Sequence, residues 1–315
     1  MSTLANELKR YLAIRRSLGF QLRTTARVLK RFVTFADSQS AAYVTTDLFL
    51  RWRQGFGQAS SNTWAARFGM VSQFAQWLNG IDARHEVPPR SMFHWRYRRT
   101  RPHIYSDEEI LQILDGATRL QSINGIRALT FSTLFGLIAI TGLRISEAVA
   151  LDDGDVDLVN GVVTVRHGKS GKSRIVPVSR SATDRLTDYA AERNRLLGRT
   201  PVSFFVSDAG TRPTDCMVRY NFAVVCQQIG LRTAQRYNRH GRGPRIHDLR
   251  HTFAAHTLLN WYRTGMDPER EMVKLSTYLG HTDPAHTYWY LEAIPELLEL
   301  ASSRVTGPAR QEVSR

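Results

Sequence analysis

Five short motifs between residues 141 and 290 carry side chains that could act on a phosphodiester. In chain order they contain Arg144 (in Thr-Gly-Leu-Arg-Ile-Ser-Glu, residues 141–147), Lys169, His247 with Arg250 (in His-Asp-Leu-Arg-His-Thr-Phe, residues 247–253), His281 (in Leu-Gly-His) and Tyr290. Each motif alone has an ordinary explanation, because a surface arginine at a helix junction or a lysine on a turn is usually only solvated. Together they supply what cleavage of a phosphodiester by an alcohol requires: fixed positive charge, a base, an acid and a nucleophile.

The composition indicates a partner of opposite charge. The chain has 315 residues, with 43 Lys and Arg against 28 Asp and Glu, which gives a formal charge of +15. Such an excess in a globular protein indicates a polyanion, most often nucleic acid. Hydrophobic residues make up 42% of the chain, which is enough for a substantial core, and the length favours two domains.

Several classes of protein are disfavoured by the sequence. Its two cysteines, Cys216 and Cys226, cannot form a disulfide framework or a Cys-rich zinc site, and they indicate a reducing cytoplasm. The first residues lack the basic and apolar regions of a signal peptide. The most apolar stretch, residues 129–143, is shorter than a membrane span and predicts a buried helix. The sequence shows no acidic triad of a two-metal nuclease that outranks the basic set, so we expect no metal and no cofactor.

Residues 1–83 predict a small helical domain with a basic surface. Apolar side chains recur at helical spacing, arginines and lysines lie between them, and glycines separate the runs. Residues 84–103 predict a linker, because three prolines discourage regular structure. Six arginines in this segment oppose a single Glu86, so we expect a basic strap that neutralises phosphates.

Residues 104–315 predict a mostly helical domain that contains a small antiparallel sheet. Ser106 and Glu109 form the capping box of its first helix. Strands are expected at residues 156–159, 162–166 and 174–178, with Asn160-Gly161 as a type I′ turn and Lys169 on the second loop. Helices are expected before this sheet, through residue 150, and after it, from about 181 to 303. The predicted fold class is therefore mostly α with a small antiparallel β-sheet (α+β).

The motifs resemble those of the tyrosine recombinases, the phage integrase family that includes XerC- and XerD-like enzymes. All six chemical positions occur in the family's order and approximate spacing, and the resemblance covers about residues 103–300. The helical N-terminal domain resembles the family's core-binding domain only in size, helicity and charge. Residues 261–274 are longer than the family pattern. Residues 275–281 (Leu-Ser-Thr-Tyr-Leu-Gly-His) resemble recombinases of mobile elements.

The resemblance implies a role for each position in cutting DNA through a covalent 3′-phosphotyrosyl intermediate, without metal or ATP. The assignments are Tyr290 as nucleophile, Arg144 and Arg250 as phosphate-stabilising groups, His281 as a further hydrogen-bond donor, His247 as base or proton relay, and Lys169 as general acid. Glu147 is expected to position the Arg144 segment. Tyr288 lies two residues from Tyr290, so only one of them can face the phosphate from a helix, and the family spacing selects Tyr290.

The resemblance predicts a site-specific tyrosine recombinase for integration, excision or transposition of a mobile element. A type IB topoisomerase-like enzyme is one alternative, and a catalytically silent DNA-binding protein of the same fold is the other. The compact N-terminal domain and the tail after Tyr290 favour a recombinase, and the complete set of six residues favours catalysis. The expected location is the prokaryotic cytoplasm, at the nucleoid while the enzyme acts, with no membrane.

The tail, residues 291–315, predicts a helix with one apolar stripe formed by Ile294, Leu297, Leu298 and Ala301. This helix could pack on its own catalytic domain. The resemblance implies instead that it docks into a neighbouring protomer and couples active sites. We expect a free monomer that forms a dimer on one DNA site and a homotetramer on two sites.

Overall fold

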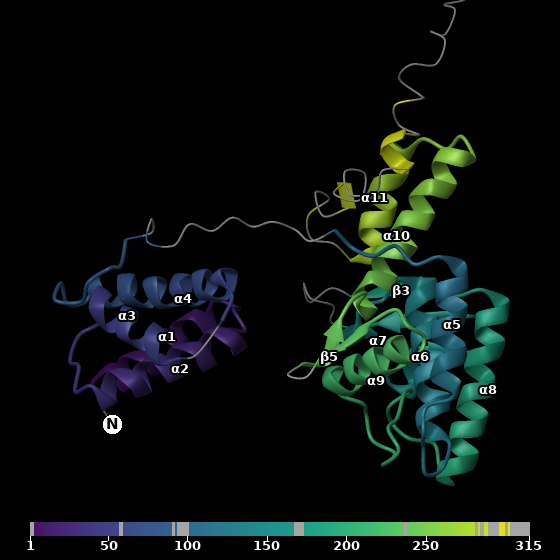
Figure 1. The fold of residues 1–315 in the computed structure, drawn as a ribbon, viewed down its shortest axis with the longest axis horizontal. Helices are drawn as coiled ribbons and strands as arrows, with labels where there is room; N and C mark the ends of the chain where they lie inside the picture. Colours follow the sequence, from purple (N-terminus) through teal and green to yellow (C-terminus); the bar gives the residue numbers. More distant parts are fainter. Residues whose placement is uncertain are drawn as a thin grey trace, which may run out of the picture. The chain divides into compact units, whose positions relative to one another are not determined.

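The computed structural model describes residues 3–56, 59–89, 92, 101–166, 173–235, 238–280, 283, 287–288, 296–299 and 302. The chain divides into two compact units, Met1–Thr100 (unit 1) and Arg101–Arg315 (unit 2). Figure 1 colours unit 1 purple to blue and unit 2 teal to yellow. Within the described ranges, no helix combines the length and the apolar character that crossing a membrane requires.

The described part of unit 1 is helical, as the spacing of its apolar residues predicts. Its helices are α1 (Thr3–Ser17), α2 (Arg23–Ser38), α3 (Thr46–Gly55) and α4 (Ser61–Asn79). Thr45 and Ser60 begin α3 and α4 by accepting hydrogen bonds from backbone N–H groups of the first turn. Phe32, Phe49 and Phe74 are fully buried and belong to an aromatic-rich core to which all four helices contribute.

The start of the predicted linker packs on unit 1. The backbone N–H of Val44 donates to Nδ1 of His85 at 3.1 Å, and that of Thr46 donates to Oε2 of Glu86 at 2.9 Å. These bonds hold residues 85 and 86 at the beginning of α3. Residues 90, 91 and 93–100 of the predicted basic strap lie outside the described residues.

Most helices of unit 2 pack around one apolar helix. They are α5 (Asp107–Thr118), α6 (Ile126–Thr141), α7 (Ile145–Ala150), α8 (Arg180–Leu197), α9 (Asp215–Gln228), α10 (Ile246–Arg263) and α11 (Pro268–Leu279). The predicted buried helix is α6, which contacts α5, α8, α9 and α10. The predicted capping box of Ser106 and Glu109 is confirmed at the start of α5. Helix α6 thus forms the centre of the unit's main core.

The predicted three-stranded antiparallel sheet is confirmed. Its strands β1 (Val156–Asp157), β2 (Val162–Val165) and β3 (Arg174–Pro177) lie in the order β1-β2-β3. The type I′ turn is wrong. Asp157 pairs with Val162, which leaves a four-residue connection, and within this fully described connection only Gly161 has a positive φ, +66°. The Asp157 carboxylate accepts bonds from the backbone N–H groups of Val159 and Asn160, at 3.0 and 2.9 Å, and these bonds stabilise the wider turn.

Two stretches predicted as helix are not helical. Residues 199–214 form an irregular segment in which Phe204 and its neighbours are buried, and the Phe204 N–H donates to the Leu151 carbonyl at 3.0 Å. Pro201 and Pro213 lie near the two ends of this segment and disfavour a helix.

The second of these stretches contains strands β4 (Thr233–Gln235) and β5 (Asn238–Arg242), which form a two-stranded antiparallel sheet. Gly241 (φ +63°) permits their close pairing, because a Cβ there would lie 2.2 Å from the Thr233 carbonyl oxygen.

Helices α10 and α11 form a second core of unit 2. Leu258 of α10, Leu275 of α11 and Leu297 of the tail are buried in one apolar cluster. The sequence segment 261–274, whose role was not evident, supplies the end of α10, a turn with Gly265 at φ +73°, and the first turns of α11. Helix α11 ends at Leu279, directly before the Gly280 carbonyl that accepts a hydrogen bond from Arg144.

Candidate active site

Arg144 lies at the junction between α6 and α7. Gly142 ends α6 with φ +62°, and a Cβ there would lie 2.7 Å from Cδ1 of Phe253, so the close approach of α10 requires glycine. Arg144 then adopts an extended backbone conformation as the N-cap of α7. The Thr-Gly-Leu-Arg motif therefore turns the chain sharply and leaves the arginine side chain part-exposed at the turn.

One buried carboxylate, that of Glu147, holds two arginines. Oε1 of Glu147 accepts a hydrogen bond from Nη1 of Arg144 at 2.7 Å, and Oε2 accepts one from Nη2 of Arg174 at 2.7 Å. Oε2 also accepts the Arg144 backbone N–H at 3.0 Å. Burial alone would raise the pKa of Glu147, but the bonds from Arg174 and Arg144 outweigh it and lower this pKa to about 2. The expectation that Glu147 positions the Arg144 segment is confirmed by these contacts.

Arg250 is a buried arginine whose guanidinium joins two helix ends. Its Nη1 donates to the Gly142 carbonyl at 2.7 Å, and its Nη2 donates to the Leu279 carbonyl at 2.6 Å. Carbonyls at helix C-termini carry partial negative charge, so they suit a cation. Only 2% of Arg250 is exposed, and these bonds fix the orientation of the guanidinium.

The turn after α11 completes the cluster. Nη2 of Arg144 donates to the Gly280 carbonyl at 2.9 Å, and Nε of Arg174 donates to the Tyr278 carbonyl at 2.7 Å. Gly280 has φ +65°, and a Cβ there would lie 3.0 Å from Nη1 of Arg174. The glycine of the Leu-Gly-His motif therefore allows the arginines to approach the chain immediately before His281.

His247 opens α10 one turn before Arg250. Its ring packs edge-on against His251, with 4.8 Å between ring centroids, and the residue keeps an exposed side. Desolvation by the surrounding protein, followed by the positive charges of Arg250, Arg245 and Arg144, lowers the pKa of His247 to about 4 despite the opposing effect of Asp248. The imidazole is therefore neutral near pH 7 and can accept a proton.

Arg174 is the functional candidate that the sequence reasoning did not single out. Arg174 begins β3 and lies on the same face of the strand as buried Val176, whereas Ile175 between them faces outward and is exposed. An arginine on the inward face of a strand needs a buried partner, and here that partner is Glu147. This alternation was the available signal.

Three predicted site residues lie outside the described residues: Lys169, His281 and Tyr290. The structure describes their chain neighbours. Arg166 and Ser173 flank the Lys169 loop, and Gly280 precedes His281. Tyr288 is 43% exposed. The structure thus brings together Arg144, Arg250 and His247, and the other three assignments stay predictions.

The assembled cluster can bind a phosphate. Arg144 and Arg174 share the Glu147 carboxylate, and Arg250 bonds to the Gly142 and Leu279 carbonyls. These three arginines and one carboxylate leave two positive charges with His247 neutral. Arginine forks match phosphate oxygens bidentately and stay charged. This arrangement suits stabilisation of a phosphodiester as charge develops on its non-bridging oxygens.

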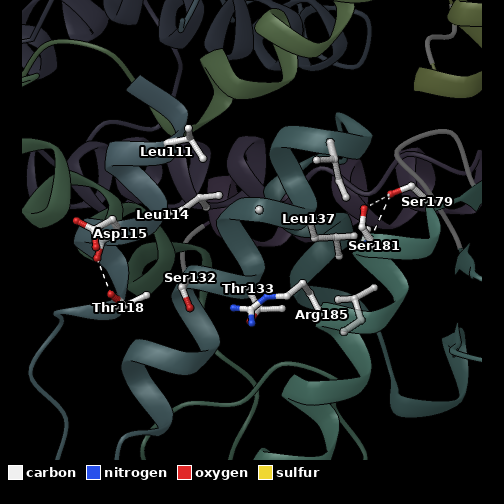
Figure 2. A pocket seen from close by; sticks show the side chains of 14 residues that line it. Leu111, Leu114, Asp115, Thr118, Ser132, Thr133, Leu137, Ser179, Ser181 and Arg185 are labelled. Carbon is white, nitrogen blue, oxygen red and sulfur yellow. Dashed lines mark hydrogen bonds between the residues drawn. The ribbon is translucent and has the colours of Figure 1, made fainter. Parts of the chain in front are cut away.

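A separate groove of about 470 Å³ lies between α5, α6 and α8 (Figure 2). Leu111, Leu114 and Leu137 contribute much of its apolar lining, and Arg185 reaches it from α8. None of the three clustered arginines lines this groove. We therefore assign it no part in the chemistry.

The fold and the cluster define a class: a mostly helical protein whose second unit gathers Arg144, Arg174 and Arg250 at the ends of α6 and α11. The chain belongs to the phage integrase family, whose model matches residues 105–296. It is thus a tyrosine recombinase, in a family of enzymes that cleave and rejoin DNA strands.

Relatives and solved structures agree with this family. The y4rB protein of Sinorhizobium fredii, named as an integrase/recombinase, is 39% identical over 97% of this chain and 98% of its own length. The tyrosine recombinase XerD of Staphylococcus haemolyticus is 26% identical over 92% of this chain and 94% of its own. The Tn1549 transposon integrase in complex with transposon right end DNA has a TM-score of 0.63 at 15% identity, covering 96% of this chain and 99% of that one. The last likeness shows a shared fold.

Proposed function

We propose that this protein cuts and rejoins duplex DNA at specific sites through a covalent 3′-phosphotyrosyl intermediate on Tyr290. The observation that carries the proposal is a cluster of three fixed guanidiniums next to Gly280, the residue before His281. Glu147 holds Arg144 and Arg174, and the Gly142 and Leu279 carbonyls hold Arg250. A protein that only bound DNA would not need neutral His247 in the same cluster.

The proposed reaction is a transesterification. The Tyr290 oxygen attacks the scissile phosphorus, and the bond from phosphorus to the 5′-oxygen breaks. The tyrosine proton passes to His247, directly or through a relay, and Lys169 gives a proton to the leaving 5′-oxygen. Arg144 and Arg250 stabilise the charge on the non-bridging oxygens, and His281 donates a further hydrogen bond. Reversal by another strand's 5′-hydroxyl rejoins the DNA, so no ATP is consumed.

A nicked suicide substrate tests this function. Wild-type protein should accumulate a covalent DNA adduct, because the small fragment leaves and rejoining is blocked. Tyr290→Phe should form no adduct while its DNA affinity changes little, since only a hydroxyl is lost. Tyr288→Phe is the matched control and should form adduct normally. Adduct formation by Tyr290→Phe would overturn the nucleophile assignment.

The arginines and the lysine have separate tests. Arg144→Ala and Arg250→Ala should each reduce adduct formation about 10²-fold or more, because each leaves developing charge unpaired. Lys169→Ala should be rescued by a bridging phosphorothiolate, whose sulfur leaves without a proton. Absence of rescue would contradict the general-acid role.

We further propose a mobile-element role, in integration, excision or transposition. The y4rB relative is named as an integrase/recombinase, and a fold relative is a transposon integrase. A topoisomerase of the same chemistry would relax any supercoiled plasmid, whereas a recombinase should exchange strands only between matching sites. A plasmid carrying two copies of the element's ends distinguishes the two activities.

The proposed organisation is a helical core-binding domain (residues 1–83), a basic linker (84–103) and a catalytic domain (104–315). We propose that the free protein is a monomer, that it forms a dimer on one site, and that it forms a homotetramer on two. Fold relatives include a lambda integrase dimer bound to a COC′ core site. Light scattering of the free protein and of its complexes with one- and two-site DNA tests this assembly.

A further inference from the structure

Two arginines of unit 1 share one aromatic ring. The guanidinium carbon of Arg31, on α2, lies 4.0 Å from the centroid of Phe56, and that of Arg67, on α4, lies 4.1 Å from the same centroid. Arg67 also lies 4.7 Å from the centroid of Trp64. A guanidinium that lies over a ring can keep its in-plane N–H groups available for hydrogen bonds.

Neither of these arginines has a carboxylate partner among the residues that the structure describes. Nη1 of Arg67 is buried and makes no hydrogen bond to any of those residues. Burial, followed by the positive charge of Arg31, lowers the pKa of Arg67. In the same unit Arg51 is paired, because its Nε lies 2.9 Å from Oδ2 of Asp47. The pair over Phe56 is thus an uncompensated concentration of charge.

The surroundings of Phe56 suit an anion. A hollow of about 450 Å³ beside the ring is lined by Lys30, Arg31, Thr34, Phe35, Ser38, Trp52, Gly55 and Phe56. Arg31 and Lys30 bring two cations to this hollow, and Thr34 adds a hydroxyl donor. Residues 1–89 contain twelve Lys and Arg against five Asp and Glu, so the unit as a whole also attracts polyanions.

We propose that Arg31, Arg67 and Phe56 form a phosphate clamp, which takes one backbone phosphate of the duplex DNA on which unit 2 acts. The inference deepens the proposed function and rests on it. The clamp reads no base, because guanidiniums on a phosphate position the duplex without distinguishing its sequence. The rings hold both guanidiniums in place before DNA arrives.

Salt-dependent DNA binding by the full chain tests the clamp. Arg67→Met and Arg31→Met should each weaken binding about 10-fold near 0.15 M salt, equally on site and non-site duplexes. Each should also reduce the slope of log affinity against log salt by about 0.9, the value for one phosphate. The double variant should lose no more slope than either single variant, because both arginines bind one phosphate. Arg51→Met is the matched control and should leave the slope unchanged.

Thermal unfolding of the free protein separates binding from folding. Arg67→Met should unfold no earlier than wild type, because it removes a half-buried cation repelled by Arg31. Arg31→Met removes an exposed side chain and remains informative even if Arg67→Met unfolds early. The clamp would be overturned if Arg31→Met left the slope of log affinity against log salt unchanged, or if Arg51→Met reduced that slope equally.

Two further measurements identify the ligand and distinguish failure of the clamp from failure of the proposed function. Inorganic phosphate, added at the same concentration as the phosphates of the DNA, should displace little of the duplex from the protein. Strong displacement would mean that the clamp binds a free anion instead of a DNA phosphate. At saturating protein, Arg67→Met should still form the covalent adduct on nicked DNA. Absence of the covalent adduct in the wild type would refute the proposed function. Normal adduct formation by Arg67→Met, together with an unchanged slope of log affinity against log salt, would refute the clamp alone.

Discussion

Glu147→Gln should disconnect the arginine cluster while preserving its shape. Glutamine occupies nearly the same volume, but it carries no charge and cannot accept hydrogen bonds at both terminal atoms. Arg144 and Arg174 would then lose the carboxylate that they share. The glutamine oxygen could still accept a bond from one of them, and both guanidiniums would keep their bonds to the Gly280 and Tyr278 carbonyls.

The size of the effect follows from the pKa of Glu147. Its lowering from an ordinary 4.5 to about 2 corresponds to about 3 kcal/mol of stabilisation of the charged form. Because the folded-state pKa is depressed, this stabilisation is fully present above pH 4.5 and is lost as the pH falls toward 2. The variant should therefore be about 3 kcal/mol less stable at pH 7, and this difference should narrow by about 1 kcal/mol between pH 5 and 3.5.

Urea unfolding of the full chain at pH 7, 5 and 3.5 measures this difference. Adduct formation on the nicked substrate should fall about 10-fold or more, because Arg144 loses its fixed orientation. Glu192→Gln is the matched control. Glu192 pairs with Arg195 on the exposed face of α8. Its replacement should therefore change neither the free energy of unfolding nor adduct formation appreciably.

A result in which Glu147→Gln and Glu192→Gln are equally stable at pH 7 would refute the reasoning. So would a stability difference that stays constant between pH 5 and 3.5, since it would show that the charge on Glu147 is not what matters. Normal cleavage by a clearly destabilised Glu147→Gln would separate stability from positioning and remove the carboxylate from the mechanism.

Three further predictions follow from described contacts. Adduct formation should not decrease near pH 6.5, because the pKa of His247 is lowered to about 4 and its imidazole stays neutral there. A decrease at pH 6.5 that is absent from His247→Gln would contradict this prediction. Gly280→Ala should cost about 1–2 kcal/mol and reduce cleavage, because φ is +65° and Nη1 of Arg174 lies 3.0 Å from the new Cβ. The control Gly265→Ala, at φ +73° with no atom within 4 Å, should have the conformational cost alone and cleave normally. Leu297→Ala should destabilise the protein by about 2–5 kcal/mol in urea unfolding, whereas Leu298→Ala, at a 50% exposed side chain, should have little effect; equal effects would contradict packing of the tail on its own unit.

Much of the fold could be predicted because its signals are local. The helical spacing of apolar residues predicted the helices of unit 1, and the capping box predicted the start of α5. The small sheet followed from the change of period around residue 160. The turn within it was predicted wrongly because a side-chain effect, the bonds of Asp157 to the following backbone, outweighed the Asn-Gly preference.

The errors after residue 198 arose where distant contacts decide the conformation. Residues around Phe204 form an isolated bridge and backbone hydrogen bonds with the chain near Leu151, a pairing that no local pattern reveals. The site shows the same division. Motifs predicted Arg144, His247 and Arg250, but the role of Arg174 depends on a partner 27 positions earlier in the chain, Glu147.

The bonds of Arg144 and Arg250 to the end of α11 also set the order in which the enzyme can mature. Arg144 donates to the Gly280 carbonyl, 136 positions later. Arg250 donates to the Leu279 carbonyl and also to the Gly142 carbonyl, 108 positions earlier, so it joins the end of α11 to the end of α6. Contacts of such separation form late, after locally paired helices such as α5 and α6. During synthesis the chain could fold unit 1 well before Tyr278 has left the ribosome. A prematurely terminated product could then occupy target DNA without cutting it, and so interfere with the full-length enzyme.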